Sequence, residues 1–188
     1  MSKERQEFIN KYSNDVIKAT QGTGLFPSVK MAQFIIESAN RQGQAGQGIT
    51  FLKANNGFGI KADKNYKGVK MAFNTPKDGK PISYFRVYNS PLDSIKDHTA
   101  FMLNNKRYTT HGVFRATTPE AQIDALAKAG YSESPTYAKA LKAMVSAYNL
   151  KALDSKAPTA GTTTNNNNTA ILFFLLAAGV VFYLDKNQ

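Results

Sequence analysis

The sequence has no cysteine and only two histidines, His98 and His111. The absence of cysteine excludes disulfide bonds and thiol chemistry. Zinc sites in proteins are built mostly from cysteine and histidine ligands, so this composition argues against a zinc site. We expect an activity that uses no metal and no other cofactor.

Acidic residues are also scarce, because 13 Asp and Glu stand against 24 Lys and Arg, for a formal net charge of +11 in 188 residues. A strongly basic chain favours polyanionic surroundings, such as nucleic acid, an anionic membrane face or a bacterial cell wall. The basic residues are not gathered in blocks, and the sequence carries no nucleic-acid-binding motif. We therefore expect no nucleic acid partner, which leaves a membrane or the cell wall.

The N-terminus lacks the apolar core of a signal peptide, because its opening stretch, MSKERQEFINKYSNDVIKAT, is charged throughout. Phe8, Ile9, Tyr12, Val16 and Ile17 recur at helical spacing, which predicts an amphipathic first helix. We therefore expect no cleavable secretory leader in this stretch.

Composition divides the chain into three regions. Residues 1–153 have the mixed composition of a folded domain, and they are numerous enough for one compact core. Residues 154–169, DSKAPTAGTTTNNNNT, hold almost no bulky apolar groups, so they cannot offset their ordering entropy and are interpreted as a flexible linker. Residues 170–184, AILFFLLAAGVVFYL, carry no charge.

The uncharged segment 170–184 has two interpretations, a buried core helix and a membrane anchor. As a helix it spans roughly 22 Å, short of the ~30 Å hydrocarbon core unless Thr169 and the neighbouring asparagines extend it. A polar tether precedes it and the polar end DKNQ follows it, which argues against a core position. We predict a C-terminal transmembrane helix that anchors the domain to a membrane.

Helix and strand signals are unevenly distributed along the first region. Three Ser-Pro or Thr-Pro pairs each offer an N-cap side chain followed by proline at the first helical position; they begin at Ser90, Thr118 and Ser134. Between about residues 69 and 88 the pattern changes to two strands around a central Asp-Gly, which is a hairpin signal. We predict the α+β class, a mostly helical domain with a small β-hairpin lobe.

A carboxylate, Glu37, directly follows the apolar run of MAQFII. In a helix that begins near Pro27, Glu37 lies one step round from Ile36, at the border of the apolar face. A solvated helix carboxylate is the common outcome for such a position. The alternative is a general acid, because a carboxyl group held against apolar neighbours keeps its proton to higher pH. Periodicity alone leaves both interpretations open.

Four blocks of sequence follow one another between about residues 9 and 150: PSVKMAQFIIESANRQG (27–43), NNGFGIK (55–61), FRVYNSPLDSIKDHTAFM (85–102) and AGYSESPTYAKALKAMVSAYNL (129–150). Together they resemble the bacterial N-acetylglucosaminidases of glycoside hydrolase family 73, which includes the flagellar peptidoglycan hydrolase domain. The resemblance implies a lysozyme-like fold and cleavage of the β-1,4 bond after N-acetylglucosamine in the cell-wall glycan. In the third block, Asp97 and His98 are interpreted as structural helix contacts.

The resemblance also implies roles for single residues. Glu37 matches the family's general acid. A tyrosine of the closing block lines the family's active cleft; the likeness favours Tyr131, with Tyr137 as the alternative, and its hydroxyl could orient the substrate's 2-acetamido group or stabilise developing charge. Asn56 and Phe58 are candidate substrate-binding residues, although Phe58 could equally be a core plug beneath its loop.

One position departs from the family pattern. Many members carry a second glutamate about four residues before the hairpin glycine, and Thr75 occupies that place here. Asp63 and Asp78 are candidates for the second carboxylate, although neither fits the family position. Either one of them serves, or the substrate's acetamido carbonyl is the nucleophile, or the general acid works alone as in lytic transglycosylases. We favour the substrate-assisted account and assign Thr75 to substrate binding.

Two other functions compete with this interpretation. One is a lytic transglycosylase or muramidase, and the other is a catalytically inactive, wall-binding structural protein of a membrane-containing virion, for which Thr75 is the best evidence. The expected partners are glycan strands, the membrane and, for a phage lytic enzyme, other virion or lysis proteins. The expected location is a membrane, in the cell or in a virion, from which the domain acts on the periplasmic wall.

Overall fold

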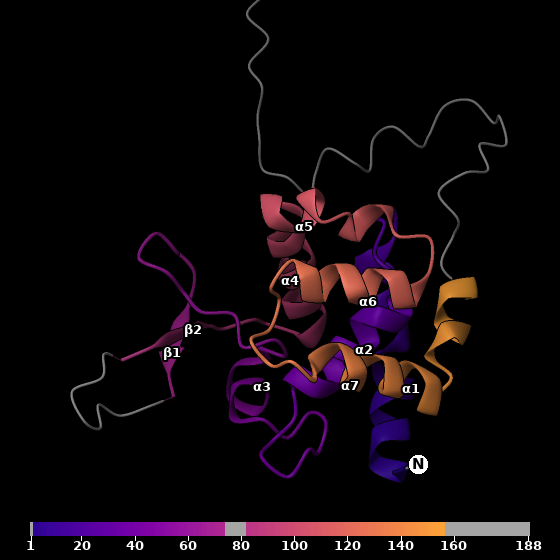
Figure 1. Ribbon diagram of the computed structural model, residues 1–188. Coiled ribbons are helices and arrows are strands. Elements are labelled where there is room, and N and C mark those ends of the chain that lie inside the picture. The colour runs from indigo at the N-terminus through magenta and orange to yellow at the C-terminus, as the bar shows by residue number, and fades with distance from the viewer. Residues whose placement is uncertain (1, 74–81, 157–188) are drawn as a thin grey trace, which may run out of the picture. The chain divides into compact units, whose positions relative to one another are not determined.

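The computed structural model describes residues 2–73 and 82–156 (Figure 1). These residues form a helical body with one two-stranded sheet, so the predicted α+β class is confirmed. The elements are α1 (Lys3–Thr20), α2 (Pro27–Glu37), α3 (Ile49–Ala54), β1 (Lys70–Ala72), β2 (Tyr84–Arg86), α4 (Pro91–Leu103), α5 (Lys106–Thr110), η1 (Val113–Arg115), α6 (Pro119–Lys128), α7 (Tyr137–Ala147) and η2 (Leu150–Lys156).

Helix α2 lies at the centre of the core. Every residue from Pro27 to Ile35 is buried, and α2 packs against α1, α6, α7 and η2. A helix that is buried on all sides is apolar nearly all round, as the stretch PSVKMAQFII almost is. The sequence predicted one apolar face with Glu37 at its border; instead the helix is buried on all sides as far as Ile35, and the partly buried Glu37 is its last residue.

The N-terminus of α2 is capped from the far end of the chain. Phe26, at the N-cap position, makes no side-chain cap hydrogen bond. The Asp154 carboxylate accepts two hydrogen bonds of 2.8 Å, from the backbone N–H and the hydroxyl of Ser28, where the helix dipole favours negative charge. Because η2 continues to Lys156, residues 154–156, which the sequence assigned to the start of a linker, lie in a helix that packs on the domain.

The Ser-Pro and Thr-Pro signals are correct for two helices of three. Ser90 and Thr118 cap α4 and α6, and each side chain accepts a hydrogen bond from the N–H three residues on. Ser134 begins a turn instead, in which its carbonyl accepts a hydrogen bond from the N–H of Tyr137. Helix α7 therefore starts at Tyr137, after the proline rather than at it. The first helix, α1, buries the predicted apolar face apart from the half-buried Ile17.

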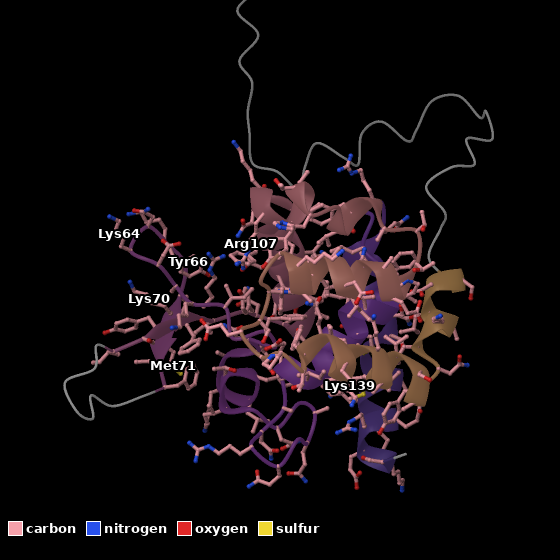
Figure 2. The ribbon with its side chains drawn as sticks, in the orientation of Figure 1. Lys64, Tyr66, Lys70, Met71, Arg107 and Lys139 are labelled. Carbon is pink, nitrogen blue, oxygen red and sulfur yellow. The ribbon has the colours of Figure 1, made fainter. Side chains whose placement is uncertain are left out.

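The hairpin lobe is present but its strands are short. Strands β1 and β2 are antiparallel, with Lys70 opposite Arg86, and an isolated bridge joins Lys61 to Phe85. The side chain of Lys70 lies on this lobe, away from the helices (Figure 2). The lobe is tied to the body at its base, where the N–H of Tyr88 donates to the carbonyl at the end of α3.

Several predicted features lie outside the described residues. Thr75 and Asp78 fall within residues 74–81, and the anchor segment 170–184 lies beyond residue 156. In the part of the chain that the structure describes, no helix is both long and apolar enough to cross a membrane.

Candidate active site

Two features of its position make a negative charge on Glu37 unfavourable. It is the last residue of α2 and is partly buried. Desolvation by burial raises the pKa of its carboxyl group, and a hydrogen bond from Tyr137 opposes this only in part. The negative end of the helix dipole acts in the same direction as burial, because it disfavours an anion at a helix C-terminus. The carboxyl group therefore keeps a transferable proton to higher pH than an exposed glutamate does.

Glu37 lies on the wall of a cleft of about 410 Å³. The other lining residues come from the loop after α3, β2, α4, α5 and the turn after α6: Phe58, Gly59, Ile60, Lys61, Asp63, Arg86, His98, Phe101, Arg107, Tyr108, Tyr131 and Ser132. A larger hollow of about 560 Å³ beside α1 holds Glu4 and Glu7. There a hydrogen bond from Ser2 lowers the pKa of Glu4, which suits an anion and not a proton donor. The cleft at Glu37 is therefore the candidate active site.

Tyr131 is placed in the cleft by the end of helix α6. Gly130 adopts φ +66°, and the N–H of Tyr131 donates to the carbonyl of Leu126 while that of Gly130 donates to Ala127. This pair of hydrogen bonds is a Schellman motif, which glycine makes accessible by its freedom at positive φ. The ring of Tyr131 stacks on that of Tyr137, with centroids 5.4 Å apart. The short sequence Ala-Gly-Tyr thus fixes the position of the cleft tyrosine.

The two candidate tyrosines have different contacts. The hydroxyl of Tyr137 donates a 2.8 Å hydrogen bond to Glu37 Oε1, whereas the hydroxyl of Tyr131 lies 2.9 Å from Nε2 of His98. Burial raises the pKa of both phenols, so both are neutral hydroxyl groups that can donate. Only Tyr131 of the two is among the residues that line the cleft. Tyr131 therefore lies on the cleft, while Tyr137 is bonded to the carboxyl group of Glu37.

We expect Tyr137→Phe to move the alkaline limb of the pH–activity profile to higher pH, by up to about one pH unit. The lost hydroxyl donates to Glu37 and favours its anion, so without it the pKa of Glu37 rises further. A general acid works only when protonated, so activity is lost as pH rises through that pKa, and later in the variant. Profiles of kcat/KM would measure the shift, with Tyr148→Phe as control, since the Tyr148 hydroxyl accepts hydrogen bonds from Ser2 and from Arg5 on α1. A limb that stays in place or moves to lower pH would contradict the role of Tyr137.

The NNGFGIK loop supports the cleft from inside. Asn56 is fully buried, and its carboxamide bonds the backbone of Ile60 and Arg86 at 2.9–3.0 Å. The structure therefore places Asn56 within the loop, as a residue that shapes the cleft, and not on the surface where the sequence suggested substrate contact. Phe58 is 8% exposed and packs on both His98 and Phe34, with centroids 3.9 and 5.3 Å apart. Phe58 is therefore mainly a core residue, and its exposed part lines the cleft.

Of the two candidates for a second carboxylate, Asp63 is in the described part of the chain. It is exposed and lines the same cleft as Glu37. Its Oδ1 accepts a 2.7 Å hydrogen bond from the N–H of Asn65. Across residues 2–73 and 82–156, no group of three His, Asp or Glu side chains could hold a metal ion.

Asp97 ties the hairpin lobe to helix α4. Its Oδ2 accepts hydrogen bonds from Arg86 at 2.8 Å and from the hydroxyl of Tyr88 at 2.6 Å. The guanidinium group of Arg86 also lies 4.6 Å from the ring centroid of Tyr66. The predicted structural role of Asp97 fits these contacts, which hold one wall of the cleft against the helical body.

A buried lysine behind the cleft was missed by reasoning from the sequence. Lys30 in α2 is 1% exposed, and its Nζ lies 2.7 Å from Nδ1 of His98. Its signal was available, because it is the one charged residue of PSVKMAQFII, and a charge inside a helix buried all round needs a partner. His98 is accordingly more than a helix contact, since it joins Lys30 to Tyr131.

A carboxyl group with a raised pKa, neutral tyrosine hydroxyls beside it and a cleft between a helical body and a hairpin lobe are the parts of a glycoside hydrolase that works by general acid catalysis. Comparison with known proteins narrows this class. The model of the Glucosaminidase family, described as mannosyl-glycoprotein endo-beta-N-acetylglucosaminidase, matches residues 13–150. The chain belongs to the Glucosaminidase family, and the resemblance seen in the four sequence blocks is confirmed.

Relatives of known structure or curated function support this membership. The peptidoglycan hydrolase FlgJ of Salmonella typhimurium is 31% identical over 166 residues, 83% of this chain and 49% of the relative. The exo-glucosaminidase LytG of Bacillus subtilis is 31% identical over 166 residues, 83% of this chain and 56% of the relative. The chain thus spans about half the length of these curated relatives. The solved glycoside hydrolase domain of S. typhimurium FlgJ is similar at a TM-score of 0.61 and 29% identity, over 83% of this chain and 92% of that one.

Proposed function

We propose that the chain is a peptidoglycan hydrolase that cleaves the β-1,4 bond after N-acetylglucosamine in bacterial cell-wall glycan strands. The observation that carries the proposal is the position of Glu37 on the wall of a cleft, where burial raises the pKa of its carboxyl group. Support for the substrate comes from the family and from relatives named as a peptidoglycan hydrolase and an exo-glucosaminidase. The net charge of +11 suits a polyanionic wall.

The proposed reaction has two steps and uses the substrate's own nucleophile. Glu37 gives its proton to the glycosidic oxygen while the acetamido carbonyl oxygen attacks the anomeric carbon, so the bond to the leaving sugar breaks and an oxazolinium ring forms. The Glu37 carboxylate then takes a proton from a water molecule, which attacks the same carbon and reopens the ring. Glu37 ends protonated, and the product keeps its anomeric configuration. Tyr131 is assigned to hold the acetamido group for the attack.

A second mechanism is favoured by the position of Asp63. This carboxylate is exposed and lines the same cleft as Glu37, and we assign it in this mechanism to the base that activates water on the opposite face of the sugar. An enzyme of that kind inverts the anomeric configuration. The stereochemistry of the first-formed product therefore separates the two mechanisms.

We also propose that residues 170–184 anchor the domain to a membrane, from which it reaches the periplasmic wall. The support is the uncharged apolar sequence of this segment, with polar stretches on both sides. We propose that this anchored hydrolase is a phage lytic enzyme, delivered by a virion membrane or by other lysis proteins.

Mass spectrometry of the products of peptidoglycan digestion tests the proposed function. We expect new reducing ends of N-acetylglucosamine from purified peptidoglycan. Products that end in 1,6-anhydro-N-acetylmuramic acid would identify a lytic transglycosylase, and reducing N-acetylmuramic acid would identify a muramidase. A folded protein that releases nothing would favour a wall-binding structural protein.

A further inference from the structure

A line of buried polar groups runs behind the cleft, from α2 through α4 to the turn after α6. Lys30 Nζ lies 2.7 Å from His98 Nδ1, and His98 Nε2 lies 2.9 Å from the hydroxyl oxygen of Tyr131. Lys30 and His98 are 1% and 2% exposed. No ion pair with a carboxylate neutralises Lys30 within the described part of the chain. An uncompensated buried lysine is costly, and the assigned reaction makes no use of it.

The hydrogen-bonding capacities of the three groups fix a direction along the line. A lysine ammonium group has three donors and no acceptor, so it donates to Nδ1 of His98. A neutral imidazole that accepts at Nδ1 carries its proton on Nε2 and donates there. Nε2–H therefore donates to the Tyr131 oxygen, and the Tyr131 hydroxyl does not donate its own proton to His98. Because Tyr131 lines the cleft, this proton is available for a hydrogen bond to a bound substrate.

We propose that Lys30 is a positioning residue that, through the tautomer of His98, orients the Tyr131 hydroxyl as a hydrogen-bond donor into the cleft. This inference rests on the proposed function, in which Tyr131 holds the carbonyl oxygen of the substrate's acetamido group. A carbonyl oxygen only accepts hydrogen bonds, so a tyrosine that donates to His98 would present the wrong polarity to it. By donating to Nδ1 of His98, the Lys30 ammonium group disfavours the tautomer in which Nε2 accepts a hydrogen bond from Tyr131.

The line is also sensitive to pH. Burial lowers the pKa of Lys30 to about 7, while burial and the charge of Lys30 keep the pKa of His98 well below its ordinary value. As pH rises through the pKa of Lys30, the neutral amine gains a lone pair and can accept Nδ1–H, which frees Tyr131 to donate to Nε2. The Tyr131 hydroxyl is therefore directed into the cleft as a donor at pH below the pKa of Lys30, and it can turn to His98 at pH above it.

Other groups around the line do not fix its direction. Lys30 also faces the sulfur of Met102 on α4, at 3.5 Å, and the ring of Phe58, at 5.4 Å from its centroid, and neither is a titratable group. The pKa of Tyr131 is raised first by burial and then by the charge of Glu37 on α2 and by Tyr108 on α5, and is lowered by Tyr137 on α7 and Arg107 on α5. Tyr137 acts on Tyr131 through a side-chain hydrogen bond, but its own proton is donated to Glu37, so this contact does not set the tautomer of His98.

Nitrogen NMR of the histidine rings in the full chain tests the direction without any activity assay. The chain has only two histidines, and His111 is an internal reference, because its Nδ1 lies 2.7 Å from a backbone carbonyl and must carry the proton. At pH below the pKa of Lys30 we expect His98 to be protonated on Nε2, the opposite of His111. In Lys30→Met we expect a shift toward the Nδ1–H form, and in Lys30→Gln, which keeps an N–H donor, the wild-type tautomer.

Kinetics then test whether the tautomer matters to the reaction. We expect Lys30→Met to lower kcat roughly 10-fold, the scale at which partners behind an active-site ligand act, and Lys30→Gln to restore most of the loss. In a Tyr131→Phe background Lys30→Met should have no further effect, because a residue that acts through the hydroxyl is not additive with its removal. Lys139→Met, on the exposed face of α7 (Figure 2), is the matched control.

Each outcome decides one part of the proposal. An Nδ1–H tautomer of wild-type His98 at pH below the pKa of Lys30, or equal kinetic losses from Lys30→Met with and without the Tyr131 hydroxyl, would overturn it. If Lys30→Met does not fold, the tautomer of His98 in the wild type and its change with pH still show whether Lys30 directs it. Absence of glucosaminidase activity in the wild type would remove the proposed function alone, since the tautomer would still show whether Lys30 directs His98.

Discussion

Glu37→Gln is expected to lower kcat at least ~10²-fold, the usual scale for loss of a general acid, while the domain stays folded. Glutamine has nearly the same shape, and its carbonyl oxygen can still accept the hydrogen bond that Tyr137 donates to Glu37. It has no proton to give to a glycosidic oxygen, so the leaving sugar must depart as an alkoxide. Release of reducing sugar from peptidoglycan measures the loss, and thermal unfolding confirms that the variant is folded.

The control for this prediction is Glu7→Gln, a glutamate on the exposed side of α1 that pairs loosely with Lys3 at 3.9 Å. This change removes a carboxylate from the larger hollow beside α1 and should leave kcat unchanged. Wild-type turnover by a folded Glu37→Gln protein would show that the chemistry lies elsewhere. A large loss in Glu7→Gln alone would move the active site to the hollow beside α1.

Local signals in the sequence predicted the elements whose causes are local. Ser90 and Thr118 cap helices through hydrogen bonds to residues only three positions away, and such a pattern can be read from a short stretch. The cap of α2 could not be read in this way, because Asp154 lies 126 positions from Ser28. The composition around Asp154 is that of a linker, and only the tertiary contact makes it part of the domain.

The site shows the same division between local pattern and tertiary contact. The apolar run before Glu37 predicted a carboxyl group near apolar neighbours, and the structure adds that α2 is central to the core. The sequence could not choose between Tyr131 and Tyr137, because both lie in one block and their roles depend on contacts with His98 and Glu37. Asn56 resembles a cleft residue by its place in a glycine-rich loop, yet its carboxamide makes hydrogen bonds to backbone groups of Ile60 and Arg86.

Tyr131→Phe is expected to lower kcat by roughly 10² to 10³, the cost of removing one donor that stabilises the reacting groups. The phenyl ring should keep its stacking on Tyr137, so the effect isolates the hydroxyl. Kinetics on peptidoglycan measure the loss, and a fall in kcat that exceeds the change in KM would place the interaction in the transition state. Asp63→Asn is the matched change at another residue that lines the cleft, and in the substrate-assisted account it should alter turnover little.

The chemistry of the acetamido group gives the decisive contrast. If its carbonyl oxygen is the nucleophile, a thiazoline analogue of the cyclised sugar should inhibit the wild type, and de-N-acetylated glycan should be cleaved poorly. Tyr131→Phe should bind the thiazoline less tightly as well, because the Tyr131 hydroxyl is assigned to hold the acetamido group, whose position the ring of the analogue takes. Suppose instead that Asp63→Asn abolishes activity in a folded protein, that thiazoline has no effect and that Tyr131→Phe is nearly wild type. Asp63 would then be the second carboxylate, the first-formed product would be inverted, and the substrate-assisted account would be wrong.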